Sequence, residues 1–198
     1  MGEEPPVSNP LSAAVLAGGM SRRMGRDKAL QTVAGRTLLA RAVDAVRDVA
    51  SDVCIVGYRD AYRAFSVPVI VDEYPGAGPL GGIATALRHA RQEFVLVVAC
   101  DLPFLSVPLL RAMAALPRSY DVLLPVTTDP RSRQPGEHTR QTLHAIYRRT
   151  CLERFDGRLR RGERQVVAAL DGLVVRELPE SWIRGYDPNL RSLMNANR

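Results

Sequence analysis

Residues 79–101 read PLGGIATALRHARQEFVLVVACD, and this stretch contains both kinds of secondary structure on which the fold depends. In its first half, Ile83, Leu87 and Ala90 recur at helical spacing, which predicts a helix over 79–92 with one apolar stripe. In its second half, residues 94–100 are apolar without interruption, which is typical of a strand buried on both faces. That strand ends at a carboxylate, Asp101. A helix followed by such a strand predicts an α/β protein.

The same alternation of strand and helix extends along most of the chain. Residues 127–140 show no periodicity, which predicts a long mobile loop, and residues 181–198 predict a mostly irregular end. We expect a single-domain, Rossmann-like, three-layer αβα sandwich with a mainly parallel sheet. The other strands are expected at 12–17, 52–58, 67–72, 120–126, 141–148 and 173–178, and the other helices at 37–50, at 107–116 after a Ser106 N-cap, and in two short segments after 148.

Length and composition set the class of protein. The chain has 198 residues, of which 46% are hydrophobic and 24% charged, and this suits one globular domain. We expect a flexible tail at 1–11 and a single domain at 12–198. No stretch reaches the roughly 18 uncharged apolar residues of a membrane span, and the acidic, proline-rich start is unlike a signal peptide. A cytoplasmic protein with no membrane partner is therefore expected.

The charge of the chain indicates which kinds of ligand it can bind, and its cysteines indicate whether it has disulfides or a zinc site. The net charge of +6 favours anionic ligands. Aromatic residues make up only 6% of the chain and no basic run contains interleaved stacking residues, so no nucleic-acid partner is expected. Cys54, Cys100 and Cys151 are odd in number and far apart, which predicts reduced thiols and argues against a zinc site.

The loop after the first strand is rich in glycine and positive charge. Residues 16–28 read LAGGMSRRMGRDK. Glycines let the main chain approach a ligand closely, so that its N–H groups can bind phosphate oxygens, and the basic side chains can add charged hydrogen bonds. The spacing differs from the common GxxxxGK[ST] and GxGxxG loops, because Lys28 lies three residues after Gly25 with no hydroxyl behind it. The loop predicts a phosphate-binding site of another type.

Two carboxylates follow neighbouring expected strands. Asp72 comes after the strand at 67–72 and precedes EYPGAGPLGG, whereas Asp101 ends the most apolar strand. Ligands of parallel α/β sheets bind beyond the carboxyl ends of the strands. A carboxylate at the end of a buried strand needs a partner, and Mg²⁺ bound to phosphates is a natural one. The loop and the two aspartates together predict a Mg²⁺–nucleotide site.

These stretches resemble a known family. LAGGMSRRMGRDK, VDEYPGAGPLGG and VVACDLPFL resemble nucleotidyltransferases of the glycosyltransferase-A-like superfamily, the nucleotide-diphospho-sugar transferase type. RQTLHAIYRR, GERQVVAAL and the closing NAN make the chain similar to the molybdenum cofactor guanylyltransferases, the MobA family, over residues 12–197. The resemblance implies transfer of GMP from GTP to molybdopterin with Mg²⁺ as cofactor. It also implies a nucleotide-binding half at about 12–105 and an acceptor-binding half at about 106–198.

The resemblance also implies roles for particular residues. Backbone groups of Leu16, Ala17 and Gly18 would hold the guanosine side, and Asn195 and Asn197 would lie at the pterin-side pocket. The phosphate and metal side of the site would be formed by Gly19, Arg23, Lys28, Asp72 and the Mg²⁺ ligand Asp101, with Arg23, Lys28 and Asp101 as the catalytic set. Arg158, Arg160, Arg161 and Arg164 would form either a solvated surface or a docking patch for a protein that delivers molybdopterin.

Departures from the family leave alternatives open. Family members often have asparagine in the turn after the second strand, where this chain has Val56-Gly57-Tyr58, and this leaves base selection open. One alternative is a cytidylyltransferase acting on molybdopterin or another phosphorylated acceptor. Another is a non-catalytic nucleotide- or cofactor-binding relative. The three histidines, His89, His138 and His144, are not expected to act as a base, because a phosphate nucleophile is already largely ionised at pH 7.

Overall fold

The structure is a computed structural model that describes residues 10–18, 27–128 and 138–196. Within these ranges, eight strands form one sheet in the order β10-β7-β9-β6-β1-β4-β5, with β8 paired to β7. The strands are β1 (Leu11–Leu16), β4 (Asp52–Val56), β5 (Val69–Ile70), β6 (Phe94–Ala99), β7 (Val122–Thr128), β8 (His138–Arg140), β9 (His144–Arg148) and β10 (Val175–Leu178). A separate hairpin pairs β2 (Thr32–Val33) with β3 (Arg36–Thr37).

Six described segments form α-helices. They are α1 (Leu38–Arg47), α2 (Pro79–His89), α3 (Val107–Ala115), α4 (Cys151–Arg160), α5 (Val166–Ala169) and α6 (Glu180–Ile183). Shorter 3₁₀ helices lie at Lys28–Leu30, Asp60–Phe65 and Arg191–Leu193. None of the helices in the described ranges is long and apolar enough to cross a membrane.

The sheet is mixed but mostly parallel. β1 pairs in parallel with both β4 and β6, β4 with β5, and β10 with β7. β9 runs antiparallel between β6 and β7, and β8 is antiparallel to β7. The predicted α/β class with a mainly parallel sheet is therefore confirmed, and β9 separates the parallel strands into two groups.

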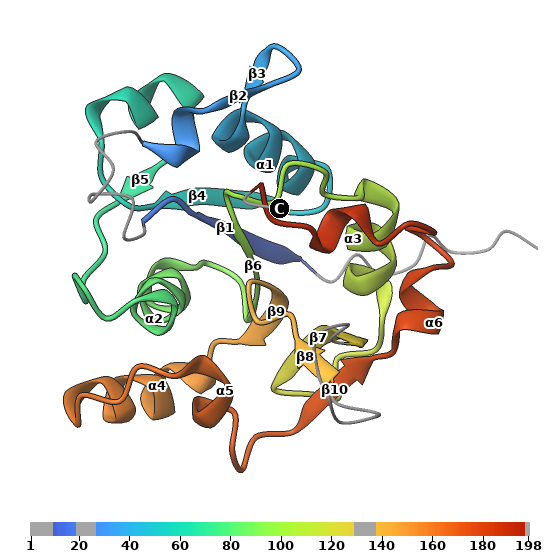
Figure 1. Cartoon of the computed structure of the whole chain (residues 1–198). Coiled ribbons are helices and arrows are strands. Elements are labelled where there is room, and N and C mark those ends of the chain that lie inside the picture. The colour runs from blue at the N-terminus through green and yellow to red at the C-terminus, as the bar shows by residue number, and fades with distance from the viewer. Residues whose placement is uncertain (1–9, 19–26, 129–137, 197–198) are drawn as a thin grey trace, which may run out of the picture.

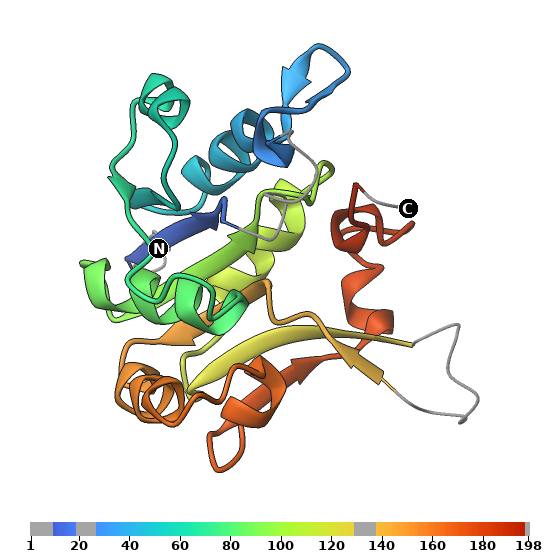
Figure 2. The same cartoon turned by 60° about the vertical axis from the view of Figure 1, so that its left-hand side comes forward.

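Alternate residues of the central strand enter two different cores. Leu96 and Val98 of β6 belong to a cluster that contains the apolar stripe of α1 and residues of α3. Val95 and Val97 point to the opposite face and join a cluster with α2, α4 and α5. Figures 1 and 2 show these helices on the two sides of the sheet. The three-layer αβα arrangement follows, because a strand with apolar residues on both faces needs a helical layer on each.

Side-chain caps begin two of the helices. The hydroxyl of Thr37 accepts a hydrogen bond from the backbone N–H of Ala40 at 3.2 Å, at the start of α1. Ser106 does the same for Leu109 at 3.3 Å, so the predicted N-cap of α3 is confirmed. Such caps satisfy backbone donors that have no partner within the helix.

Three expectations differ from the structure. The predicted loop at 127–140 is wrong at both ends, because β7 continues to Thr128 and residues 138–140 form β8, while residues 129–137 lie outside the described ranges. The strand expected at 67–72 is confined to Val69–Ile70, where its pairing with β4 ends. The C-terminal segment contains α6 and a 3₁₀ helix, and the apolar residue Ile183 anchors it because this side chain is fully buried.

Candidate active site at the carboxyl ends of the parallel strands

The parallel register brings the ends of β1, β4 and β6 together. Leu16 pairs with Val56 on one side and with Ala99 on the other. Beyond the strands, the N–H of Ala17 donates to the carbonyl of Val56 at 2.8 Å, and the N–H of Cys100 donates to the carbonyl of Leu16 at 3.1 Å. Ala17 and Cys100, which follow β1 and β6, therefore lie side by side at the carboxyl ends of the strands, and residues 19–26 of the glycine-rich loop lie outside the described ranges.

The turn that carries Lys28 begins with a capping aspartate. The carboxylate of Asp27 accepts a hydrogen bond from the backbone N–H of Ala29 at 3.0 Å. The charges of Lys28 and Asp101 both act on the thiol of Cys100, in opposite directions. Burial, followed by the charge of Asp101, raises the pKa of the Cys100 thiol to about 12, whereas the charge of Lys28 acts to lower this pKa. Lys28 and Asp101 therefore lie on the same edge of the sheet.

The carboxylate of Asp101 has no hydrogen-bond partner among the described residues. Its side chain is half-buried, and no side chain or backbone N–H in the described ranges hydrogen-bonds to its carboxylate. Its backbone carbonyl accepts a hydrogen bond from the N–H of Ala196 at 2.9 Å. That bond brings the neighbouring Asn195 to Asp101, although the two are far apart in the sequence. A partly buried carboxylate without a partner costs free energy until a cation or donor satisfies it.

Asp72 differs from Asp101, because its carboxylate is already used within the protein. It accepts hydrogen bonds from the backbone N–H of Tyr74 at 2.9 Å and from the hydroxyl of Thr85 at 3.3 Å. Thr85 in turn accepts a hydrogen bond from the N–H of Glu73 at 3.1 Å. Asp72 therefore fixes the loop before α2, which the sequence pattern alone did not reveal.

The loop before α2 is also fastened to α4. The hydroxyl of Tyr74 donates to Asp156 at 2.6 Å, and Arg88 forms ion pairs with both Asp156 and Glu73. Arg164 donates to the carbonyl of Gly76 at 3.1 Å. These contacts hold the segment that follows Asp72 against the lower helical layer of Figure 1.

Gly57 allows the turn after β4 to approach the loop after β1. Its φ is +142°, and a Cβ at this position would lie 3.1 Å from the carbonyl carbon of Ala17 and 3.3 Å from the N of Gly18. Only glycine fits this conformation and this spacing without strain. Tyr58, the next residue, is 54% exposed and donates to Asp60 at 3.1 Å, so its ring lies at the surface beside this turn.

Tyr62 is a residue that the sequence analysis missed. Its side chain is only 1% exposed, and its hydroxyl bonds the carbonyl of Ala17 at 3.1 Å and the carboxylate of Asp27 at 2.7 Å. It comes from the short helix between β4 and β5, where no motif or periodicity marks it. Its proximity to residues on each side of 18–26 could be found only from the structure.

A buried polar group holds the C-terminal segment. One carboxylate oxygen of Asp187 accepts hydrogen bonds from the backbone N–H of Ser192 at 2.8 Å and from its hydroxyl at 2.6 Å. Asp187 and Ser192 are both buried.

His144 is fully buried at the start of β9, and this burial lowers the pKa of its imidazole to about 4, which suits a structural role. Trp182 packs its ring 4.9 Å from that of Tyr186.

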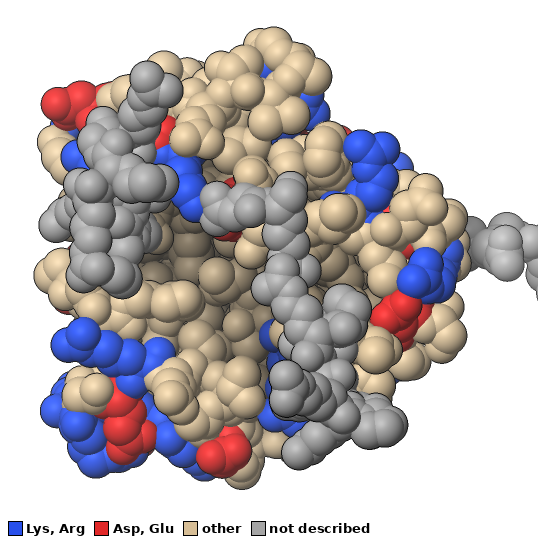
Figure 3. All heavy atoms as spheres, viewed as in Figure 1, with Lys and Arg blue, Asp and Glu red and all other residues tan. Residues whose placement is uncertain are grey.

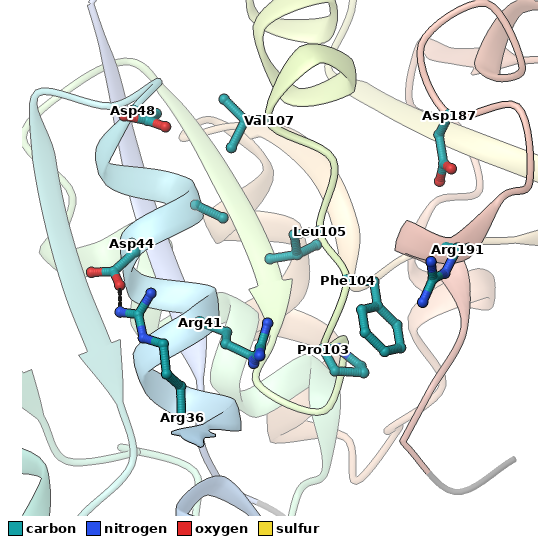
Figure 4. Close-up of a pocket in the computed structure, with 11 residues that line it drawn as sticks. Arg36, Arg41, Asp44, Asp48, Pro103, Phe104, Leu105, Val107, Asp187 and Arg191 are labelled. Atoms are coloured by element: carbon teal, nitrogen blue, oxygen red, sulfur yellow. Dashed lines mark hydrogen bonds and ion pairs between the residues drawn. The ribbon is translucent and has the colours of Figure 1, made fainter. Parts of the chain in front are cut away.

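A cavity of about 480 Å³ lies beside this site (Figure 4). It opens between α1 and the segment after Asp101, and Phe104 and Arg191 form its side nearest the C-terminal segment. Arg191 lies over the ring of Phe104 at 4.4 Å. Arg36 is paired with Asp44 and is therefore not available to an anion in this arrangement. The remaining lining residues are Arg41, Ala45, Asp48, Pro103, Leu105, Val107 and Asp187.

The basic side chains of the α4 region are largely paired. Arg158 and Arg161 each contact Glu163 at 2.7 Å, and Arg164 bonds to a backbone carbonyl. Figure 3 shows blue and red atoms interleaved over α4, and a hollow near the centre of the same face whose floor is mostly tan. Two of the four arginines named for the docking patch therefore contact a carboxylate, and both contact the same one.

The remaining expectations have mixed outcomes. Gly19, Arg23 and Asn197 lie outside the described residues. The three cysteines are free thiols, and burial is the main cause that raises the pKa of Cys54 and Cys151 to about 12 each. No group of three or more His, Cys, Asp or Glu side chains within the described ranges is placed to hold a metal.

Comparisons with known proteins identify the family. Residues 13–173 match the family described as MobA-like NTP transferase domain. A probable molybdenum cofactor guanylyltransferase from Chloroflexus aggregans is 36% identical over 198 residues, covering 97% of this chain and 91% of that protein. The crystal structure of molybdopterin-guanine dinucleotide biosynthesis protein A from Archaeoglobus fulgidus has a TM-score of 0.73 at 26% identity, covering 93% and 91% of the two chains.

A more distant neighbour shares the fold alone. The 2-C-methyl-D-erythritol 4-phosphate cytidylyltransferase from Thermus thermophilus has a TM-score of 0.64 at 22% identity, covering 84% of this chain and 87% of that one. The resemblance seen in the sequence is thereby confirmed. The chain belongs to the MobA-like family of nucleotidyltransferases, among the relatives named molybdenum cofactor guanylyltransferases.

Proposed function

We propose that this protein transfers GMP from GTP to molybdopterin, giving the guanine dinucleotide cofactor and pyrophosphate. The observation that carries the proposal is that Ala17, Lys28 and Asp101 lie at one edge of the sheet, and that the carboxylate of Asp101 has no hydrogen-bond partner within the described part of the chain. Membership of the family supports the same reaction. The nucleotide would occupy the half at about 12–105, and the acceptor would occupy the half at about 106–198.

The nucleotide would bind mainly through backbone groups. Leu16, Ala17 and Gly18 would contact the guanosine side, and Gly18 has nothing in the described ranges within 4 Å of the position of a Cβ, so a ligand can approach it. Gly19, Arg23 and Lys28 would bind the phosphates. Asp72 would act on the nucleotide by fixing the loop before α2, and its bonds to Tyr74 and Thr85 support this role.

Lys28 is the only lysine among the 27 lysine and arginine residues of the chain. A lysine ammonium is a compact point charge, whereas the arginine guanidinium is a wide planar fork. A point charge can follow the departing phosphates as negative charge builds on them. The presence of lysine at this one position supports its assignment to the triphosphate.

The donor chemistry at Asp101 fits Mg²⁺. This ion binds oxygen ligands and commonly takes one or two carboxylates together with substrate phosphates and waters. The half-buried Asp101 carboxylate would supply the protein ligand, and no second protein carboxylate is required. When bound there, Mg²⁺ would supply Lewis-acid stabilisation of the phosphate charge.

The reaction needs positioning more than proton transfer. A phosphate oxygen of molybdopterin attacks the α-phosphorus of GTP, a new P–O bond forms, and the bond to the bridging oxygen breaks. The electron pair of that bond leaves on pyrophosphate. The phosphate monoester has a second pKa near 6, so it is already largely ionised at pH 7 and no histidine base is required. Arg23 and Lys28 would stabilise the leaving charge, which is the main task of a protein in such reactions.

The acceptor would meet the C-terminal segment. Asn195 lies next to Asp101 through the bond from Ala196, and we place the pterin side of the site there, with Asn197 beside it. The reaction fits a cytoplasmic protein that receives molybdopterin from a delivering protein, and it calls for neither a nucleic acid nor a membrane partner.

A cytidylyltransferase is the second candidate. The turn Val56-Gly57-Tyr58 lacks the asparagine common in the family, and the fold is shared with a cytidylyltransferase. The base therefore has to be tested directly. Calorimetric titration with GTP, CTP and ATP in the presence of Mg²⁺ distinguishes the two candidates, because the favoured base should bind at least tenfold more tightly.

The same titration on two variants tests the site. We expect Lys28→Ala to weaken GTP binding with or without Mg²⁺, and Asp101→Asn to remove the part that depends on Mg²⁺. Arg63→Ala is a control, because this exposed side chain contacts only Asp60, at 4.0 Å, in the described ranges. Preference for CTP would overturn the guanylyl assignment, and equal binding by all variants would overturn the site.

A further inference from the structure

Tyr62 connects two parts of the nucleotide-binding region that are ten residues apart in sequence. Ala17 follows β1 directly, and Asp27 caps the turn of Lys28. The phenol hydroxyl lies within hydrogen-bond distance of both, at 3.1 Å from the carbonyl of Ala17 and 2.7 Å from the carboxylate of Asp27. The ring itself is buried in the core cluster that contains the apolar stripe of α1.

The hydroxyl has one proton to donate to these two acceptors. The shorter bond goes to the carboxylate, and hydrogen bonds to charged acceptors are the shorter and stronger kind. Burial, followed by the interaction with Asp27, raises the pKa of the Tyr62 phenol well above its usual value, so the group remains a donor. Tyr62 therefore shares its one proton between the carboxylate of Asp27 and, over the longer distance, the carbonyl of Ala17, and so links the residues on the two sides of the loop.

Asp27 is held from three directions. One oxygen accepts the N–H of Ala29, and the other faces Tyr62 and the guanidinium of Arg59 at 3.6 Å. Both carboxylate oxygens of Asp27 are therefore engaged, and their contacts fix the orientation of the turn that carries Lys28. The position of Lys28, the residue after Asp27, is consequently linked to the ring of Tyr62, which the core fixes.

We propose that Tyr62 is a positioning residue, whose hydroxyl sets the distance between the end of β1 and the turn of Lys28 and so aims the ammonium at the nucleotide phosphates. This role rests on the proposed function for its ligand, but the spacing itself exists without a ligand. It assigns Tyr62 to the nucleotide side of the reaction and not to the acceptor side.

Tyr62→Phe removes only the hydroxyl, and Tyr147→Phe is a matched control. Tyr147 is also fully buried, and its hydroxyl donates to the carbonyl of Thr142 at 2.7 Å, in the other core cluster. Both variants lose one buried hydrogen bond and keep the ring. We expect similar losses of thermal stability, but only Tyr62→Phe should weaken Mg²⁺–GTP binding, by about tenfold, the effect of one good hydrogen bond.

Kinetics separate positioning from general loosening. Tyr62→Phe should raise the KM for GTP about tenfold while the KM for the acceptor stays unchanged. Asp27→Asn should act through the same contact, so the double variant should bind GTP no more weakly than the worse single variant. A Tyr62→Phe protein with wild-type GTP binding, or with equal changes in both KM values, would overturn the proposal.

A second measurement needs no nucleotide. Because Lys28 is the only lysine, an amine-specific acylating reagent followed by peptide mass spectrometry reports its reactivity alone. We expect Tyr62→Phe to change the labelling rate of Lys28 several-fold, and Tyr147→Phe to leave it at the wild-type rate. Equal labelling rates in the two variants would overturn the positioning role of Tyr62 even if the protein binds GTP. If the wild type binds no nucleotide, the proposed function fails, while the labelling rates still test whether Tyr62 positions the turn of Lys28.

Discussion

Replacing Gly57 by alanine tests whether the backbone after β1 must stay where the structure places it. The added Cβ would lie 3.1 Å from the carbonyl carbon of Ala17 and 3.3 Å from the N of Gly18, closer than ordinary van der Waals contact. The φ of +142° is also strained for any L residue and costs about 1–3 kcal/mol. For a chain of this length, each kcal/mol lowers the Tm by about 2–4 °C.

The loss of ligand binding should exceed what strain alone explains. Relief of the contact displaces the Ala17–Gly18 backbone by a few tenths of an ångström, which lengthens any hydrogen bond that these groups make to the nucleotide. The loss of one such bond weakens binding about tenfold. Calorimetry with Mg²⁺–GTP measures this directly at a temperature where the variant remains folded.

Gly35→Ala is the matched control. Gly35 has a φ of +78° in the β2–β3 hairpin, and nothing in the described ranges lies within 4 Å of its Cβ position. This variant should lose about 1–2 kcal/mol of stability through strain and keep full GTP binding. If Gly57→Ala binds GTP as tightly as Gly35→Ala does, the reasoning that places the nucleotide against this turn is refuted.

Three further predictions concern stability and the acceptor side. Burial lowers the pKa of His144 from its ordinary 6.5 to about 4 in the folded protein, so between these pH values the unfolded chain binds one more proton. The free energy of unfolding should therefore fall by about 3 kcal/mol as the pH drops from 6.5 to 4. Denaturation of a His144→Leu variant at both pH values should show a smaller fall. Ser192→Ala removes a bond to the buried Asp187 carboxylate, so it should cost about 1–3 kcal/mol in thermal unfolding and raise the KM for the acceptor, and a rise in the KM for GTP alone would contradict this. Gly81→Ala should lower the Tm, because its Cβ would lie 2.8 Å from a side-chain carbon of the loop before α2, whereas Gly157→Ala, in an open position of α4, should raise the Tm by an amount equivalent to about 0.5–1 kcal/mol.

The sequence predicted the elements whose periodicity is strong. The uninterrupted apolar run of β6 and the stripe of α2 determined the α/β class, because a strand buried on both faces requires a helical layer on each. It could not predict β8, since a segment of three polar residues, His138–Arg140, carries no periodic signal and becomes a strand only by pairing with β7.

The candidate site was predicted in part. Lys28 and Asp101 were predicted as site residues because their residue types follow strands in a parallel sheet, and the charges of both act on the thiol of Cys100. The different state of Asp72 was not predictable, because its bond to Thr85 joins residues thirteen apart across a loop. Tyr62 was missed for the same physical reason, since only the folded chain brings it to Asp27.

The central claim is most directly tested by turnover. The wild-type protein is incubated with Mg²⁺, GTP and molybdopterin, and the dinucleotide and pyrophosphate are quantified by chromatography, with CTP in parallel and Asp101→Asn as the inactive reference. The account predicts equal amounts of guanine dinucleotide and pyrophosphate, little product from CTP, and none from the variant. Preferential use of CTP, or full activity of Asp101→Asn, would contradict it.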